Sequence, residues 1–197
     1  MMTRDDILNA AAQVFSQKGF HAASMQDIAE AVNLQKGSLY HHVNSKQEIL
    51  ALLLDHALDL LIKRLEAVIA QPLPTEGKLR LAIAEYLTTI LEQKELAAVL
   101  LLEHRNLDPE LAARHNLARD QFEGLWRSLV RQGMEEGVFC CMDPVIAVMA
   151  IMGTINWTIT WYRPSGALSP AQIADQFAGL ILSGMLTRPP SPPIPQY

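Results

Sequence analysis

Apolar residues recur at helical spacing along nearly the whole chain. Positions three, four and seven apart share one face of a helix. The first such run contains Ile7, Leu8, Ala11, Val14 and Phe15. Strict alternation of apolar and polar residues, which marks half-buried strands, is scarce. The pattern therefore predicts an all-α fold of about nine helices and no strand.

Capping residues indicate where the first helices begin. Thr3, Ser24 and Ser45 each precede an apolar run. Asp27 and Glu48 stand three residues after the last two caps. This is the spacing of a capping box, in which the cap hydroxyl accepts a backbone N–H and the acidic side chain accepts one in return.

Prolines and glycines delimit the later helices. We expect a long helix from residue 46 to about 71, one from 75 to 92 capped by Thr75, and one from 95 to 105. Three further helices begin with a polar cap followed by proline at the first helical position. These starts are Asp108-Pro109, Asp143-Pro144 and Ser169-Pro170.

Residues 24–50 predict a helix-turn-helix. Asn33, which tolerates the left-handed conformation of a tight turn, separates two short helical patterns. The second helix of such a pair lies in the major groove with its N-terminal residues at the base edges. Gln35 suits adenine, and Lys36 suits guanine or a phosphate. Lys46 begins the next helix, whose free N–H groups favour a phosphate.

This region resembles the DNA-binding domain of tetracycline-repressor-type (TetR-family) transcriptional regulators. The resemblance covers residues 3–50 and is carried by the run SMQDIAEAVNLQKGSLYHHVNSKQEIL. Asn33 stands where the family usually has glycine, and Val43 where phenylalanine is commoner. The implied DNA contacts are Ser24, Gln26, Gln35, Lys36, Gly37, Ser38, Tyr40, His41 and Lys46. His42 is expected to face the domain interior or its edge.

The resemblance also implies a small-molecule effector held by the C-terminal helices. NWTITWYRPSGALSPAQIAD is similar to a signature of members that control fatty-acid, steroid and aromatic-acid breakdown, which often respond to acyl-coenzyme A thioesters. Polar groups beside aromatic walls orient a ligand. The predicted effector site is His104, Arg105, Phe122, Trp126, Met149, Asn156, Trp157 and Trp161. Trp157 and Trp161 are placed either here or in a helical core.

Two apolar helical patterns near the C-terminus predict a dimer interface. Small residues within them allow close packing, and the predicted interface is Gly153, Ala174, Ala178, Ile181 and Met185. The alternative is that both helices fill the core of one subunit. The apolar stretch 145–162 is borderline for the roughly 20 residues of a membrane span. Asn156 and several threonines interrupt it, which favours a buried helix.

Charge and composition argue against other classes. The net charge of −5 does not indicate nucleic-acid binding by itself. The expected DNA-facing surface is weakly charged, which predicts modest non-specific affinity and reliance on dimerisation. Adjacent His41 and His42 diverge by about 100° on a helix, and neighbouring Cys140 and Cys141 supply too few ligands for zinc. We expect no metal, no cofactor and no catalytic constellation. The acidic N-terminus lacks an export signal, so a cytoplasmic protein is expected.

Together these observations predict a DNA-binding domain at 1–48, a ligand-binding and dimerisation domain at 49–188, and a proline-rich flexible tail at 189–197. The expected partners are double-stranded DNA with a palindromic operator, a second copy of the chain, and an acyl-CoA or other hydrophobic acid derivative. The protein is expected to be a repressor. An activator, a helical protein-interaction module and a helical acyl-binding enzyme remain the alternatives.

Overall fold

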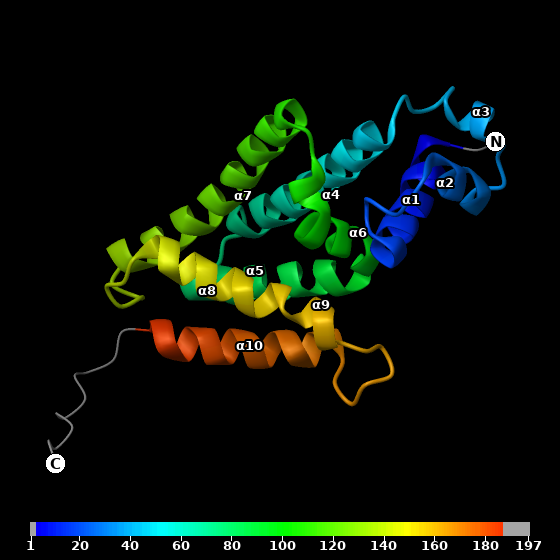
Figure 1. Ribbon diagram of the computed structural model, residues 1–197. Coiled ribbons are helices and arrows are strands. Elements are labelled where there is room, and N and C mark those ends of the chain that lie inside the picture. Colours follow the sequence, from blue (N-terminus) through cyan, green and yellow to red (C-terminus); the bar gives the residue numbers. More distant parts are fainter. Residues whose placement is uncertain (1–2, 187–197) are drawn as a thin grey trace, which may run out of the picture.

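A computed structural model describes residues 3–186, and the proline-rich tail predicted at 189–197 lies outside them. The predicted all-α fold is confirmed (Figure 1). Its helices are α1 (Arg4–Lys18), α2 (Met25–Ala31), α3 (Lys36–Leu39), α4 (Lys46–Ile69), α5 (Thr75–Glu92), α6 (Lys94–Ala98), α7 (Pro109–Glu135), α8 (Pro144–Asn156), α9 (Thr158–Trp161) and α10 (Pro170–Met185). Within residues 3–186 the β-type pairing consists of an isolated bridge between Phe139 and Leu186.

Most of the predicted helix starts are confirmed. Thr3, Ser24 and Ser169 each form a complete capping box with the side chain three residues later. Asp108 and Asp143 cap α7 and α8 in front of proline.

Two caps differ from the prediction. Thr75 is the first residue of α5 rather than its cap, and its hydroxyl donates to the Glu136 carboxylate. Ser45 caps α4, but Glu48 does not return a bond to it. Glu48 instead accepts from the backbone and side chain of Asn44. These two acidic side chains therefore tie neighbouring segments together.

The helices form two regions along the molecule. Helices α1 to α3 lie at one end, and α4 runs from them into the larger C-terminal region (Figure 1). There α4, α5 and α7 pack on one another. Tyr86, Phe122 and Trp126 contact one another in edge-on or tilted arrangements at centroid distances of 5.4–6.3 Å and are at most 4% exposed. This aromatic cluster is the centre of the larger core.

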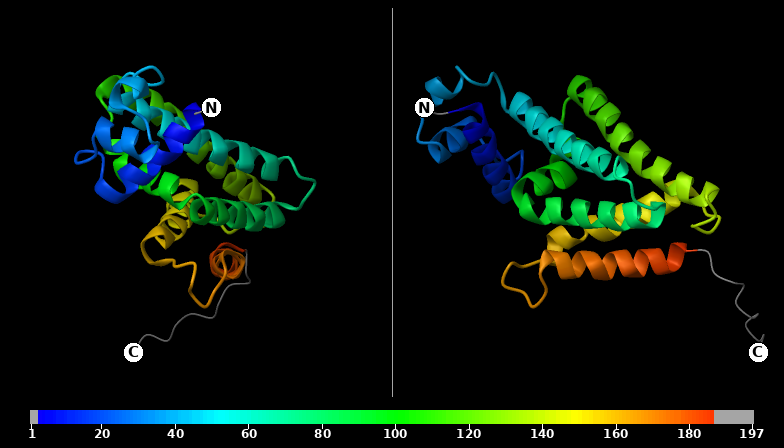
Figure 2. Two further views of the ribbon diagram at one scale, coloured as in Figure 1. Left: turned by 90° about the vertical axis from the view of Figure 1, so that its right-hand side faces the viewer. Right: turned by 180° about the vertical axis from the view of Figure 1, so that it is seen from behind.

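Helix α10 lies along α5, as the two further views also show (Figure 2). The expectation of a buried helix at 145–162 is wrong, because only 28% of Pro144–Trp161 is buried. This described segment is long and apolar enough to cross a membrane by length and composition. It is broken at Trp157, between α8 and α9, and Ile146 is 63% exposed.

The predicted helix 95–105 is not uniform. Helix α6 continues as a π-helical turn, Val99–Glu103, and then as a 3-10 turn, His104–Asn106. Changes of helical type of this kind often occur at functional sites. These two turns form an irregular segment, residues 99–106, whose π-helical part lies against both α1 and α4.

Candidate DNA-reading surface and effector cavity

The turn between α2 and α3 has the geometry that the sequence predicts. Asn33 is the one non-glycine residue with positive φ in the described chain, at 54°. The N–H of Leu34 donates to the Ala29 carbonyl at 2.8 Å, which closes the turn. Ile28 and Leu39 are fully buried between the helices. Small and apolar residues thus fix α3 at a defined angle to α2.

Seven of the predicted DNA contacts are exposed side chains or backbone at this end of the molecule. They are Ser24, Gln26, Gln35, Lys36, Gly37, Tyr40 and His41, and Ser38 is partly buried among them. The side chains of Gln35, Lys36 and Tyr40 have no hydrogen-bond partner within residues 3–186, and Tyr40 is 45% exposed. Contrary to expectation, His42 is exposed as well.

Lys46 differs from its predicted role. Its ammonium donates to the carbonyls of Phe20 at 2.6 Å and Ala23 at 2.7 Å, and lies 4.4 Å from the centre of the Phe20 ring. A third carbonyl, that of His21, is 3.4 Å away. The three ammonium donors are therefore used within the domain, where they hold the loop before α2 against the start of α4.

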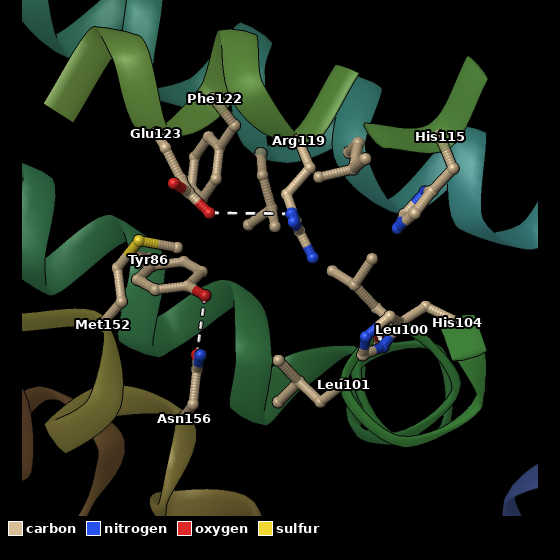
Figure 3. A pocket seen from close by; sticks show the side chains of 12 residues that line it. Tyr86, Leu100, Leu101, His104, His115, Arg119, Phe122, Glu123, Met152 and Asn156 are labelled. Carbon is tan, nitrogen blue, oxygen red and sulfur yellow. Dashed lines mark hydrogen bonds and ion pairs between the residues drawn. The ribbon is translucent and has the colours of Figure 1, made fainter. Parts of the chain in front are cut away.

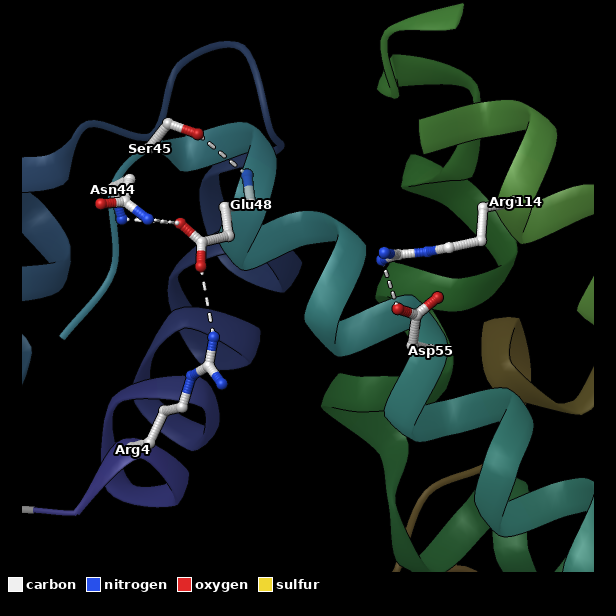
Figure 4. Close-up of polar contacts among 6 residues, drawn as sticks. All are labelled: Arg4, Asn44, Ser45, Glu48, Asp55 and Arg114. Carbon is white, nitrogen blue, oxygen red and sulfur yellow. Dashed lines mark hydrogen bonds and ion pairs between the residues drawn. The ribbon is translucent and has the colours of Figure 1, made fainter. Parts of the chain in front are cut away.

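Glu48 joins α1 to the start of α4 (Figure 4). Its carboxylate accepts from the Asn44 backbone at 2.7 Å and from Arg4 at 3.2 Å. These contacts lower the pKa of Glu48, the Asn44 backbone bond most. The first turn of α4 is thus attached both to the segment that precedes it and to α1.

A cavity of about 150 Å³ lies between α4, α5, α7, α8 and the irregular segment (Figure 3). Its apolar walls come from Leu58 and Leu61 of α4, Leu100 and Leu101 of the π-helical turn, Phe122 of α7 and Met152 of α8. Its polar lining is Tyr86, His104, His115, Arg119, Glu123 and Asn156. Few polar groups in an apolar wall are the usual construction of a small-molecule site.

Hydrogen bonds and burial set the state of these polar groups. The Tyr86 hydroxyl donates to Asn156 Oδ1 at 2.6 Å, and burial raises the pKa of Tyr86. Burial lowers the pKa of His104 and of His115, and the Arg119 charge lowers both further. The two imidazoles are therefore neutral near pH 7, while Arg119 remains a cation.

Three predicted effector residues, His104, Phe122 and Asn156, meet in this cavity. Trp126 is fully buried in the aromatic cluster behind it. The other four predictions are not supported by the geometry, because these side chains do not line the cavity: Arg105, Met149, Trp157 and Trp161. Met149 and Trp157 are 62% and 66% exposed on the outer face of the molecule.

Sequence reasoning missed Tyr86, His115, Arg119 and Glu123. A signal was present on α7, since His115, Arg119 and Phe122 stand at the i, i+4, i+7 spacing of one helix face. Tyr86 gives no comparable signal, because its place opposite α7 depends on the packing of α5.

The predicted dimer residues divide between two faces. Ala174, Ala178 and Met185 are at most 5% exposed and pack inward, so their assignment to a surface interface is corrected. Gly153 is exposed and Ile181 half-buried. The large hydrophobic side chain that α10 exposes is Leu180, at 68%. The period of α10 was correct, but the sequence did not distinguish its inner from its outer face.

Metal binding has no support among residues 3–186, where no group of three or more His, Cys, Asp or Glu side chains is placed to hold an ion. His41 and His42 are both exposed in the turn after α3.

Two family models match the chain. The model described as "Bacterial regulatory proteins, tetR family" matches residues 7–53, and "Tetracyclin repressor-like, C-terminal domain" matches residues 72–185. The HTH-type transcriptional repressor KstR2 of Mycobacterium tuberculosis is 30% identical over 189 residues, which cover 92% of each chain.

Two solved structures are similar in fold and sequence. The TetR-family regulator PfmR from Thermus thermophilus has a TM-score of 0.84 and 34% identity, covering 90% of this chain and 97% of that one. AibR in complex with isovaleryl coenzyme A and operator DNA has a TM-score of 0.84 and 25% identity, covering 90% and 96%. The chain therefore belongs to the TetR family of DNA-binding bacterial transcriptional regulators.

Proposed function

We propose that this protein is a dimeric repressor that binds a palindromic operator through α3 and leaves it when an acyl-CoA thioester enters the cavity. The observation that carries the DNA-binding part is the exposed set of unpaired polar side chains at α3. Gln35 and Lys36 face base edges, and Tyr40 and His41 contact the phosphate backbone. Lys46 acts by holding the preceding loop in position.

The effector class is supported by the cavity and by a structural neighbour. AibR binds isovaleryl coenzyme A, and its fold matches this chain. The cavity of about 150 Å³ is below the roughly 300–1,000 Å³ that encloses a drug-sized ligand. The acyl group would thus occupy the cavity, while most of the coenzyme A lies outside.

The path from cavity to DNA runs through the irregular segment. Leu100, Leu101 and His104 line the cavity, while Glu103 accepts from the Phe20 N–H at the end of α1. Gln47 of α4 donates to the Asn106 carbonyl at 2.8 Å and accepts from the Asp108 N–H. An acyl group that displaces this segment would therefore move α1, which packs on α2, and α4, which follows α3 in the chain.

The second copy is proposed to pack on the outer face of α8 and α10. Ile146, Met149, Trp157 and Leu180 are each more than 60% exposed there. A Cβ added at Gly153, Gly179 or Gly184 would meet no atom within 4 Å, so the backbone is open to close approach. A two-fold dimer of this kind places two α3 helices on half-sites ~34–36 Å apart.

We propose a regulatory rather than a catalytic role, acting in the cytoplasm, with residues 1–48 reading DNA and residues 49–188 binding effector and partner. In a gel-shift experiment on the protein's own upstream DNA, the native protein should bind. Lys36→Ala with Tyr40→Phe should weaken binding at least ~10-fold, because base and phosphate contacts are lost.

Lys63→Ala with Tyr162→Phe serves as the matched control, since both residues lie in the C-terminal region. Equal binding by the native and the Lys36/Tyr40 proteins would contradict the assigned surface. A reporter under the same promoter distinguishes repression from activation, because deletion of the regulator raises expression only if it represses.

A further inference from the structure

The cavity contains a buried polar atom without a partner. His115 is 3% exposed, and its Nδ1 has no hydrogen-bond partner within residues 3–186. Its side chain points from α7 into the cavity (Figure 3). An unpaired nitrogen is unfavourable at a buried site, because it has lost water without gaining a protein partner.

A second buried nitrogen without a hydrogen-bond partner lies one helical turn away. Arg119 Nε is buried and makes no hydrogen bond within residues 3–186. The Arg119 side chain as a whole is 44% exposed and forms an ion pair with Glu123, with 3.7 Å between Nε and Oε1. Arg119 and His115 stand at i, i+4 on α7 and face the same space. The two residues offer nitrogen atoms to a common ligand atom or group.

The other polar groups that line the cavity do not provide a hydrogen-bond partner for these two nitrogens. The His104 ring, 6.1 Å from that of His115, uses Nδ1 on the Leu100 carbonyl at 3.2 Å. On the opposite side of the cavity, the Tyr86 hydroxyl is already bonded to Asn156 (Figure 3). Between the two sides the walls are leucine, phenylalanine and methionine. A saturated acyl chain would fill the space and leave His115 Nδ1 and Arg119 Nε without a hydrogen-bond partner.

A thioester carbonyl is not a suitable partner for His115. The cavity is too small to admit the coenzyme A, so the thioester stays towards the opening. His115 is among the least exposed residues of the lining, and its partner must lie inside. The partner is therefore an atom of the acyl group beyond the thioester carbon.

We propose that the acyl group carries an oxygen acceptor of its own, a keto or carboxylate oxygen, which accepts from Arg119 Nε and from His115 Nδ1 in the tautomer that carries its proton on Nδ1. This inference rests on the proposed function and narrows its effector class from acyl thioesters in general to oxygen-bearing ones. A site built to hydrogen-bond a ligand rejects the analogue that lacks the group, because its own polar atoms are then buried unpaired.

The test compares thioesters matched in length for release of the protein from operator DNA. Butyryl-CoA is compared with acetoacetyl-CoA and succinyl-CoA, and hexanoyl-CoA with adipoyl-CoA. We expect at least one oxygen-bearing thioester to release the DNA at a concentration at least ~10-fold below that of its saturated partner. Comparison of acetoacetyl-CoA with succinyl-CoA and adipoyl-CoA shows whether the site binds a keto oxygen or a carboxylate oxygen.

Variants connect the preference to the two residues. His115→Phe and Arg119→Met should bring the ratio between matched thioesters close to one, with operator binding retained. Arg131→Met, at an exposed position of α7, should keep the native ratio. Intrinsic tryptophan fluorescence measured without DNA provides a direct binding readout, and thermal unfolding checks that each variant is folded.

The outcomes separate the inference from the proposed function. Equal release by saturated and oxygen-bearing thioesters would overturn the inference and leave the acyl-thioester effector in place. Release by none of them, with operator binding intact, would overturn both. The inference would also be overturned if both His115→Phe and Arg119→Met kept the preference for oxygen-bearing thioesters, because the oxygen would then bind elsewhere.

Discussion

The Glu103 carboxylate accepts a hydrogen bond from the Phe20 N–H, with 3.2 Å between the nitrogen and the oxygen. Glu103 ends the π-helical turn whose leucines line the cavity, and Phe20 follows the last turn of α1. The Phe20 carbonyl in turn accepts from Lys46 at the start of α4. The backbone of Phe20 thus contacts both the irregular segment and α4, the helix that connects the two regions.

Removal of this contact should uncouple sensing from DNA release. In Glu103→Ala we expect the factor by which an effector weakens operator binding to fall about five- to tenfold, since allosteric coupling is typically ~1–3 kcal/mol. Glu103→Gln retains an acceptor and should preserve most of the coupling. Operator titrations with and without effector measure the factor, and Glu110→Ala, at an exposed position of α7, is the control. If an effector weakens operator binding by the same factor in Glu103→Ala as in the native protein, the Glu103–Phe20 contact does not couple the cavity to the DNA-reading surface.

Lys36 and Lys46 should differ in how their loss affects DNA binding. Lys36→Ala removes a free cation and should reduce the slope of log affinity against log salt by ~0.9. Lys46→Met removes a cation whose donors are already bonded to three carbonyls, so affinity should fall with little change in slope. Thermal unfolding should show that only Lys46→Met destabilises the protein. An equal reduction in the slope of log affinity against log salt in both variants would show that Lys46 contacts a phosphate.

The helix-turn-helix was predictable because its signals are local. Caps such as Ser24, the left-handed Asn33 and the apolar spacing around Ile28 each constrain only a few neighbouring residues. The structure places them as expected. Local signals also predicted that Gln35, Lys36 and Tyr40 are exposed at α3, and their contact with DNA stays a prediction.

The cavity and the outer face were not predictable in the same way. Tyr86 and Asn156 are 70 positions apart in the chain and meet only through the packing of α5 against α8. The second half of α10 has apolar residues on both its inner and its outer face, so the pattern provided no basis for placing Ala178 inside and Leu180 outside. The three carbonyls that the Lys46 ammonium contacts were not predictable either, because a lysine at a helix start suits a phosphate and three carbonyls equally well.

The buried imidazoles should make stability depend on pH. Burial lowers the pKa of His115 in the folded protein, whereas in the unfolded chain it titrates near 6.5. Below that value the unfolded state binds more protons, so stability is complete above about pH 6.5 and decreases as the pH falls below it. The loss should appear as a decrease in Tm as the pH falls below about 6.5.

This pH dependence is measured by thermal unfolding between pH 8 and pH 5 without effector. His115→Phe should flatten the dependence, while His56→Phe, at an exposed position of α4, should not. An effector with a carboxylate should also flatten it, because the anion stabilises a protonated imidazole. A decrease in His115→Phe that is as steep as in the native protein, or steeper, would contradict this assignment.

The exposed face of α8 and α10 should control both assembly and DNA binding. Leu180→Glu places a charge where the second copy is proposed to pack, and burial of an unpaired carboxylate opposes association. We expect a monomer by sedimentation or light scattering. Operator affinity should fall at least ~100-fold, since a single α3 reads only one half-site. Leu117→Glu is the matched control, because Leu117 is 73% exposed on α7, away from this face, and should leave the dimer intact. A dimer that persists in Leu180→Glu but dissociates in Leu117→Glu would move the interface from α10 to α7.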